Sequence, residues 1–296
     1  MYDLIIIGAG PAGLTAALYA LRSNKKILVL EAKSYGGQII NAHKIENYPG
    51  IPEISGVQYA MTLYNQVKNF GAEFKFEAVI RIDENKNVVT PKNTYQAKAI
   101  ILATGAEKRK LGIENEARYV GKGVSYCATC DGNFYKGKDV AVVGGGNTAL
   151  EDALYLADLA SKVYIIHRRD NFRGEERLYD ELKAKANVEF IHNSNVVKLN
   201  GENEIESIDV QNNGNNITTI AIQGLFIAVG QEPNNSIFSN VVKLDEFGYI
   251  LSEDGVHTGS EGIYVAGDAR VKSLRQLTTA VGDGALAATI AIKEMM

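Results

Sequence analysis

The hydrophobic pattern at the start of the chain predicts a strand, a helix and a second strand in close succession. An apolar run from Asp3 to Ile7 precedes the glycine-rich segment 8–13, and an Ala- and Leu-rich run from Leu14 to Leu21 follows. A second apolar run, Lys26 to Leu30, ends at Glu31. Short continuous apolar runs are typical of buried strands, and the order strand, glycine turn, helix and strand predicts a βαβ unit.

The same order recurs in the middle of the chain. A strand is predicted at Asp139 to Val143, then the glycine-rich segment 144–149, a helix through Leu159, and a strand from Lys162 to Ile166. The sequence therefore predicts two Rossmann-type units.

Each unit is closed by a buried strand that ends in glycine, at Ala99 to Gly105 and at Gly224 to Gly230. Short alternating strands fill the interval, such as Ile205 to Gln211, which turns through Asn213-Gly214 into Ile217 to Ile222. The fold class predicted is α/β, with two Rossmann-like three-layer (ββα-type) nucleotide-binding domains.

The last part of the chain is expected to return to the first domain. A polar, turn-rich segment at 231–235 precedes a buried strand near Gly262 to Asp268 and a C-terminal helix from about Gln276. We therefore expect one domain at 1–110 and 238–296, and an inserted domain at 111–237. The two crossings, at about 106–116 and 231–236, are expected to act as a double hinge.

Composition narrows the class of protein. A length of 296 residues favours two domains. Lys and Arg total 31 against 35 Asp and Glu, a net charge of −4, which disfavours nucleic acid as a partner. The N-terminus has no signal-peptide pattern and no apolar run approaches a membrane span, so a cytoplasmic location is expected.

The first glycine segment predicts a dinucleotide site. Gly8 suits the tight turn, Gly10 lets the main chain approach a pyrophosphate, and Gly13 allows close helix packing. Glu31 is placed to accept hydrogen bonds from an unphosphorylated ribose. The alternative is a chance match in a loop; otherwise the site takes FAD or NAD.

The second segment, Gly144-x-Gly146-x-x-Ala149, carries arginines instead of an acid at the next strand tip. His167, Arg168, Arg169 and Arg173 follow that strand, and guanidinium groups there suit a 2′-phosphate. The alternative is a solvated basic strand end. With FAD in the first site and NADPH in the second, hydride would pass from nicotinamide to flavin.

Asp268 is then a candidate for the ribityl chain, or a turn-capping carboxylate, and Arg275-Gln276 places a helix start near the flavin ring.

The only two cysteines, Cys127 and Cys130, form a Cys-x-x-Cys motif between the two glycine segments. A helical turn after Cys127 would favour its thiolate, and Asp131 would exchange a proton with the departing sulfur, unless Asp131 is a solvated turn residue. Zinc would need about two further ligands, and His43, His167, His192 and His257 lie singly. Two idle thiols are the remaining alternative, and no metal is expected.

Taken together, these motifs resemble those of low-molecular-weight thioredoxin reductases, flavoproteins of the pyridine-nucleotide disulfide oxidoreductase group. The resemblance extends over the whole chain and rests on Gly8–Gly13, Gly36-Gly37-Gln38, Glu46-Asn47-Tyr48-Pro49-Gly50, Ala103-Thr104-Gly105, Cys127–Asp131, Gly144–Ala149, His167-Arg168-Arg169 with Arg173, Gly267-Asp268 and Arg275-Gln276.

The resemblance implies a role for each matching position. FAD would be bound by Gly8, Gly10, Pro11, Ala12, Gly13, Glu31, Gly37, Gln38, Asn47, Thr104, Gly105, Gly267, Asp268, Arg275, Gln276 and Leu277. NADPH would be bound by Gly144, Gly146, Asn147, Thr148, Ala149, His167, Arg168, Arg169 and Arg173. Many relatives carry alanine at the position of Leu277.

The resemblance also implies the order of the reaction. Cys130 would contact the flavin, Cys127 would attack a thioredoxin disulfide, and Asp131 would serve as acid and base. Family members are homodimers. Because nicotinamide, dithiol and a protein partner cannot share one face of a flavin, we expect the inserted domain to swing on its hinges between half-reactions.

Three other functions fit part of the sequence. A flavin dithiol oxidase would not need the arginines and would make peroxide without NADPH. A redox sensor or zinc-stabilised binding module would lack turnover or contain zinc. A flavin reductase for ferredoxin or flavodoxin would have no use for Cys127 and Cys130.

Overall fold

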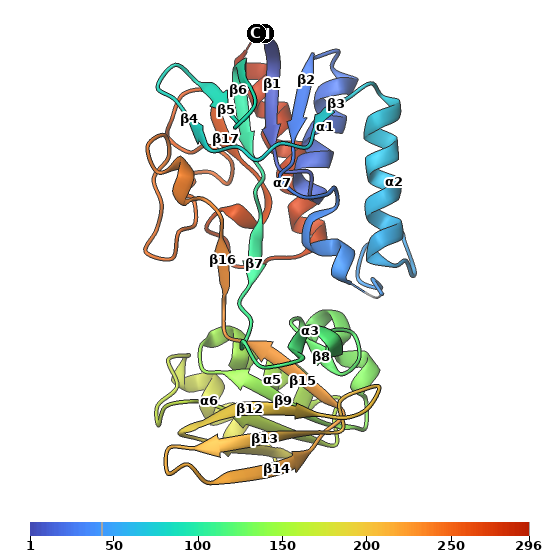
Figure 1. Cartoon of the computed structure of the whole chain (residues 1–296), viewed down its shortest axis with the longest axis vertical. Helices are drawn as coiled ribbons and strands as arrows, with labels where there is room; N and C mark the ends of the chain where they lie inside the picture. Colours follow the sequence, from blue (N-terminus) through green and yellow to red (C-terminus); the bar gives the residue numbers. More distant parts are fainter. Residues whose placement is uncertain (43, 296) are drawn as a thin grey trace. The chain divides into compact units, whose positions relative to one another are not determined.

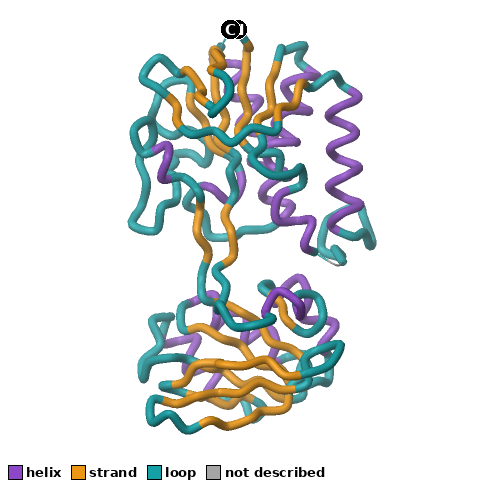
Figure 2. Tube along the Cα trace, in the orientation of Figure 1, coloured by secondary structure: helices purple, strands orange, loops and turns teal. Residues whose placement is uncertain are grey.

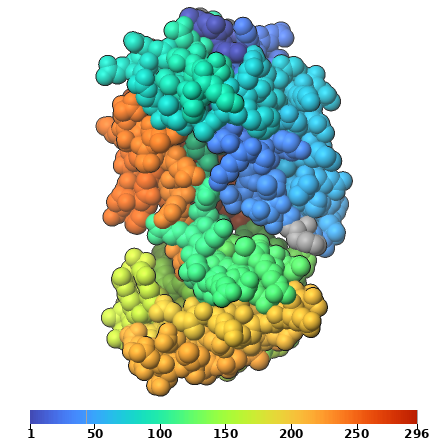
Figure 3. All heavy atoms as spheres, viewed as in Figure 1, coloured from blue at the N-terminus to red at the C-terminus, as the bar shows by residue number. Residues whose placement is uncertain are grey.

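The chain folds into two compact units. The computed structural model describes residues 1–42 and 44–295. The first unit comprises Met1–Glu107 and Glu232–Met296, and the second comprises Lys108–Gln231, so the chain crosses between them after 107 and 231 rather than after 110 and 237. In Figure 3 the blue N-terminal atoms and the orange-to-red C-terminal atoms belong to the first unit.

The first unit contains most of the longer helices. Its elements are β1 (Tyr2–Ile7), α1 (Pro11–Arg22), β2 (Ile27–Leu30), α2 (Gly56–Asn69), β3 (Glu73–Lys75), β4 (Arg81–Ile82), β5 (Asn87–Val89), β6 (Thr94–Leu102), β17 (Ile263–Val265) and α7 (Leu277–Glu294). The two crossings run through β7 (Ala106–Lys108) and β16 (Gln231–Pro233), which pair as a two-stranded sheet (Figure 1).

The second unit contains the remaining α-helices and strands. They are α3 (Glu116–Tyr119), β8 (Val124–Ser125), α4 (Ala128–Asp131), β9 (Asp139–Gly144), α5 (Asn147–Ala157), β10 (Lys162–Ile166), α6 (Glu176–Lys183), β11 (Val188–Ile191), β12 (Ser194–Asn200), β13 (Ser207–Asn212), β14 (Ile217–Ala221) and β15 (Gly224–Ala228).

A seven-stranded sheet in the order β3-β2-β1-β6-β5-β4, with β17 also paired to β6, forms the middle of the first unit. β1 runs parallel to both β2 and β6. Its side chains alternate between faces, so Leu4 and Ile6 join the core shared with the helices, while Ile5 and Ile7 join the core on the opposite face. The sheet is therefore buried on both sides.

The helical layer depends on a close approach between α7 and α1, drawn in purple in Figure 2. A Cβ atom added to Gly284 of α7 would lie 2.1 Å from the carbonyl oxygen of Ala12 in α1. Only glycine allows this contact, which fixes the C-terminal helix against the helix that follows the first glycine segment.

The second unit has three layers. Its parallel sheet, in the order β11-β10-β9-β15-β8, packs α5 and α6 on one face and the antiparallel sheet β12-β13-β14 on the other. Val140 and Val142 of β9 face the helices, whereas Ala141 and Val143 face the second sheet. This arrangement confirms the predicted α/β class.

The local differences from the predicted elements are small. The helix predicted through Leu159 ends at Ala157, and α2 was not predicted. The β13–β14 turn includes a third residue: Asn212 N–H donates to the Asn216 carbonyl at 3.0 Å, and the positive φ of 60° belongs to Asn215 rather than to Gly214. Asparagine tolerates this conformation, so the expected Asn-Gly turn is not needed.

Candidate active site

The first glycine segment forms a turn with one open position. A Cβ on Gly8, whose φ is 108°, would lie 2.3 Å from the Ala103 carbonyl oxygen, and one on Gly13 would lie 1.9 Å from the Gly8 carbonyl oxygen. The nearest atom to a Cβ on Gly10 is the Gly37 Cα at 3.9 Å. The first and third glycines are therefore required by packing, while the second leaves space in front of the main chain at the start of α1.

Glu31 lies beside this turn at the end of β2. Its Oε2 accepts the Ala9 N–H at 2.8 Å, and its Oε1 accepts the Lys33 N–H at 2.8 Å. Each carboxylate oxygen has a second lone pair, so these bonds orient the group and leave it able to accept ribose hydroxyls.

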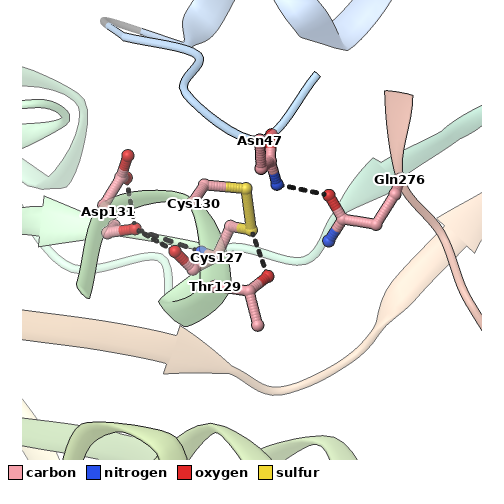
Figure 4. Close-up of a disulfide and its surroundings, with 7 residues drawn as sticks. Asn47, Cys127, Thr129, Cys130, Asp131 and Gln276 are labelled. Carbon is pink, nitrogen blue, oxygen red and sulfur yellow. Dashed lines mark hydrogen bonds between the residues drawn. A yellow bond between two sulfur atoms is a disulfide. The ribbon is translucent and has the colours of Figure 1, made fainter. Parts of the chain in front are cut away.

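The other residues predicted to bind FAD come from several separate segments of the first unit. Asn47 Nδ2 donates to Gln276 Oε1 at 3.2 Å (Figure 4), and Gln276 is the N-cap of α7, where Leu277 is buried. A Cβ on Gly267 would lie 2.8 Å from the Ala12 Cβ, which brings the turn before Asp268 against α1.

Two of the predicted residues depend on partners that the sequence did not identify. Thr104 Oγ1 donates to Oδ1 of Asn235 at 2.7 Å, and the fully buried Asn235 donates to the carbonyls of Gly248 and Ala269. Asn235 therefore belongs to the folded interior of the first unit and not to the hinge expected at 231–236. Asp283 accepts the Gly267 N–H at 3.1 Å.

The Asp283 carboxylate is held by two cations. It accepts Arg270 Nε and Nη2 at 2.9 and 3.0 Å, and Lys272 Nζ at 2.8 Å. Burial alone would raise the pKa of Asp283, but the bonds from Arg270 and Lys272 outweigh it and lower that pKa. The ion cluster stabilises the Gly267 turn.

Arg275 provides a test of whether these residues fit a flavin. Its guanidinium lies 4.1 Å from the ring centre of Tyr249, and Nη2 donates to the Arg270 carbonyl at 3.3 Å. Within residues 1–42 and 44–295, its buried Nε has no acceptor. A buried donor without an acceptor is costly, and an acceptor on a bound cofactor would remove that cost. This donor and the open space at Gly10 fit FAD.

The dithiol begins where β8 ends. Cys127 is the N-cap of α4, and its sulfur forms a disulfide with Cys130, with the two Cα atoms 5.3 Å apart (Figure 4). Both cysteines are partly exposed. The Thr129 hydroxyl lies 3.5 Å from the Cys127 sulfur.

Asp131 closes the same helical turn, and its carboxylate is anchored by a residue that the sequence analysis missed. Ser125 Oγ donates to Oδ2 of Asp131 at 2.6 Å and accepts the Cys127 N–H at 3.1 Å. Ser125 is 4% exposed, at the end of β8. In the sequence, only its position two residues before Cys127 could have indicated this contact.

The second glycine segment forms the same kind of turn as the first, but its middle glycine, Gly145, packs against a histidine ring. A Cβ on Gly144 would lie 2.4 Å from the Ala228 carbonyl oxygen, and one on Gly145 would lie 2.1 Å from the His167 ring. Nothing lies within 4 Å of a Cβ on Gly146. The open position is again the second glycine of the fingerprint.

His167 is buried beneath this segment, 5% exposed, with Nε2 3.2 Å from the Asn171 carbonyl oxygen. Its pKa is lowered, first by burial and then by the positive charges of the neighbouring arginines. The histidine is therefore neutral at pH 7 and packs against Gly145.

The arginines predicted to bind NADPH lie on the segment that follows. Arg168, Arg169 and Arg173 are exposed, and the Arg173 N–H donates to the Gly145 carbonyl at 2.7 Å. Asn147 at the start of α5 exchanges hydrogen bonds of 2.8 and 3.2 Å with Glu175. The next two predicted residues follow on α5, Thr148 exposed and Ala149 buried. The main chain of this arginine-bearing segment thus contacts the glycine turn, and its three guanidinium groups are exposed to solvent, an arrangement that fits a phosphorylated dinucleotide.

Comparison with known proteins identifies the class. Residues 2–284 match the family model described as pyridine nucleotide-disulphide oxidoreductase, and the chain belongs to that family. A thioredoxin reductase from Listeria innocua is 44% identical over 97% of this chain and 92% of its own length.

Two solved structures extend the match. Thioredoxin reductase from Streptococcus pyogenes has a TM-score of 0.95 at 42% identity, covering 100% of this chain and 98% of its own. The Lactococcus lactis thioredoxin reductase (FR conformation) has a TM-score of 0.67 at 40% identity, covering 99% and 98%.

Within its family, therefore, the chain is an enzyme of the thioredoxin-disulfide reductase type, which uses FAD and NADPH. The described residues include no helix that is both long and apolar enough to cross a bilayer. Across the same residues no group of His, Cys, Asp or Glu side chains is placed to hold a metal ion; His43 lies outside them.

Proposed function

We propose that the chain catalyses NADPH + H⁺ + thioredoxin disulfide → NADP⁺ + thioredoxin dithiol, with the Cys127–Cys130 pair as the exit for electrons. The observation that carries the proposal is the partly exposed disulfide at the start of α4, in the same unit as the second glycine turn and the exposed arginines of the segment 168–173. When bound, the cofactors supply hydride transfer from nicotinamide to flavin and two electrons to the disulfide.

Each unit has its own part in the proposal. The first unit holds FAD through the open position at Gly10, Glu31, Asp268 and the start of α7. The second unit holds NADPH through the open position at Gly146 and the arginines, whose charges orient a 2′-phosphate. The open glycine positions, the Glu31 carboxylate at the first turn and the basic segment 168–173 at the second support these assignments.

Cys127, Cys130 and Asp131 each have a separate role in the proposed reaction. Opening of the Cys127–Cys130 bond takes up two electrons and leaves Cys130 toward the flavin and Cys127 toward the partner. Asp131 gives a proton to the departing Cys127 sulfur and takes it back before that sulfur attacks. The Cys127 thiolate then attacks the partner disulfide, and Cys130 displaces the reduced partner by reforming the internal bond.

Substitution of each cysteine tests this division. Cys127→Ser and Cys130→Ser should each abolish thioredoxin reduction, because the relay needs both sulfurs, while bound flavin should still be reduced by NADPH. Stopped-flow absorbance of the flavin and a coupled thioredoxin assay measure the two steps. Thioredoxin turnover that survives in either variant would remove the dithiol from the pathway.

We infer in addition that the second unit turns on the two crossings between half-reactions. The S. pyogenes and L. lactis structures have nearly equal identity and coverage, yet their TM-scores are 0.95 and 0.67. A fall at equal identity is expected where the same parts are arranged differently. This spread supports rigid-body motion within the family.

A covalent crosslink that ties the two units should stop steady-state turnover and leave at most one half-reaction per enzyme. Multiple turnovers by fully crosslinked protein would contradict the motion.

A homodimer and a cytoplasmic location complete the proposal; sedimentation equilibrium tests the first, and cell fractionation tests the second.

A further inference from the structure

The Ser125 hydroxyl lies within hydrogen-bond distance of three groups in the turn that carries the two cysteines. It accepts the Cys127 N–H at 3.1 Å and lies 2.6 Å from Oδ2 of Asp131 and 3.3 Å from the Cys127 carbonyl oxygen. One side chain thus contacts both the main chain of the attacking cysteine and the carboxylate.

The hydroxyl hydrogen points to Asp131. A hydroxyl has one hydrogen, and the Cys127 carbonyl already accepts the N–H groups of Cys130 and Asp131 at 3.3 and 3.1 Å. The bond to the carboxylate is shorter and charge-assisted, so it is the stronger of the two.

Ser125 is fixed much more firmly than the group it contacts. It is 4% exposed and pairs with Phe226 in the parallel β15–β8 ladder. Asp131 is partly exposed at the end of a helix of four residues. The buried serine therefore restrains the orientation of the more exposed carboxylate.

We propose that Ser125 is a positioning residue for Asp131, one that holds Oδ2 and makes Oδ1 the oxygen that exchanges a proton with the dithiol. As the disulfide opens, the proton leaves Oδ1, the departing sulfur becomes a thiol and Asp131 becomes a carboxylate. As Cys127 attacks the partner disulfide, its thiol returns this proton to Oδ1. The two partner sulfurs take up the H⁺ of the overall equation and the proton that the hydride leaves once its electrons have passed to the disulfide. The inference rests on the role proposed above for Asp131.

Ser125→Ala tests the contact in the holoenzyme. A hydrogen bond to the ionised carboxylate favours that form, so its loss should move the pH midpoint of disulfide reduction to higher pH. The rate at the optimum should fall by about three- to tenfold, a part of the roughly 10² to 10⁴ supplied by general acid catalysis. Ser125→Thr keeps the hydroxyl and should restore the midpoint.

Ser194→Ala is the matched control. Ser194 is also 4% exposed in the second unit, and its hydroxyl donates to the His192 carbonyl at 2.8 Å. This variant loses a buried serine hydrogen bond away from the dithiol, so it should lower stability without moving the pH midpoint.

Infrared titration provides a readout that does not depend on turnover. The carboxylic acid C=O band of Asp131, assigned by its absence in Asp131→Asn, should shift in frequency and titrate at higher pH in Ser125→Ala. If the band and the midpoint match those of Ser194→Ala, the positioning role is overturned.

The outcomes separate this inference from the proposed function. If Asp131→Asn loses activity and Ser125→Ala behaves like the control, only the role of Ser125 falls. If Asp131→Asn keeps full activity, the acid role of Asp131 falls, and with it the proton path through Oδ1.

Discussion

At the scale of single residues, His257 joins two parts of the first unit through charged hydrogen bonds. Its Nε2 lies 2.8 Å from Glu294 at the end of α7, and its Nδ1 lies 2.6 Å from Asp254. Tyr264 donates to the other oxygen of Glu294 at 2.5 Å. These bonds, that to Glu294 first, raise the pKa of His257 and lower those of both carboxyl groups.

His257→Gln should therefore destabilise the protein in a pH-dependent way. The stabilisation from a raised histidine pKa is fully present below the ordinary value of about 6.5 and is lost as pH rises through the folded value. The Tm difference between wild type and variant should be largest near pH 5–6, where both carboxylates remain ionised, and should shrink at alkaline pH. Differential scanning calorimetry across this range measures it. A difference independent of pH would show that the ion pairs contribute nothing.

Residue types near the glycine turns and the dithiol were predictable because their constraints are local. Gly13 contacts Gly8 and Cys127 bonds to Cys130, both within a few residues, so spacing along the chain identifies them. Gly8 contacts the distant Ala103, but its place in the glycine motif still marked it. Asn235 and Asp283 were missed because what they hold, Thr104 and Gly267, lies 131 and 16 residues away. Such contacts exist only after the sheet has formed.

At the scale of elements, Glu116 at the start of α3 links the segment after the first crossing to the dithiol. Its buried carboxylate accepts the N–H groups of Leu111 and Gly112 at 3.2 and 2.8 Å and the Tyr126 hydroxyl at 2.5 Å. Burial, and then the bond to Glu116, raise the pKa of Tyr126, which therefore stays a donor. Tyr126 directly precedes Cys127, the N-cap of α4, so this contact fixes the residue next to the dithiol against α3.

Glu116→Gln should lower the free energy of unfolding by about 1–3 kcal/mol, because three donors lose a charged acceptor inside the protein. Urea unfolding followed by tyrosine fluorescence measures the change. Glu114→Gln is the control, since Glu114 is exposed two residues earlier. Equal midpoints for the two variants would mean that the carboxylate does not stabilise this segment.

The elements that the sequence predicted are those with long periodic patterns. β1, α1, β9 and α5 were predicted because each presents an uninterrupted apolar face. The short elements β8 and α4 span only Val124–Ser125 and Ala128–Asp131, too few residues for any periodicity. The most informative part of the candidate site, the Ser125–Asp131 contact, lies in these short elements.

At the scale of the whole molecule, the two units share the same kind of glycine turn, but the charged residues near the turn differ. In both, the first glycine of the fingerprint is packed against a carbonyl oxygen of a neighbouring strand or its end, and the second glycine faces open space. The Glu31 carboxylate binds the main chain of the first turn, and the main chain of Arg173, in a segment with three exposed arginines, binds the second. The proposed division of cofactors follows from that difference in charge.

A crossed pair of substitutions tests the division. Gly10→Ala should weaken flavin binding about tenfold or more, roughly 1.4 kcal/mol, and leave NADPH affinity unchanged; Gly146→Ala should do the reverse. Both sites accept a Cβ without close contact and neither has a positive φ, so each variant should fold normally.

Gly282→Ala, where the added Cβ meets nothing within 4 Å, controls for the added methyl group. Flavin absorbance of the purified proteins and calorimetric titration with NADPH report the two affinities separately. Loss of NADPH binding in Gly10→Ala with retained flavin would reverse the assignment of the units, and two unaffected variants would remove both glycine turns from cofactor binding.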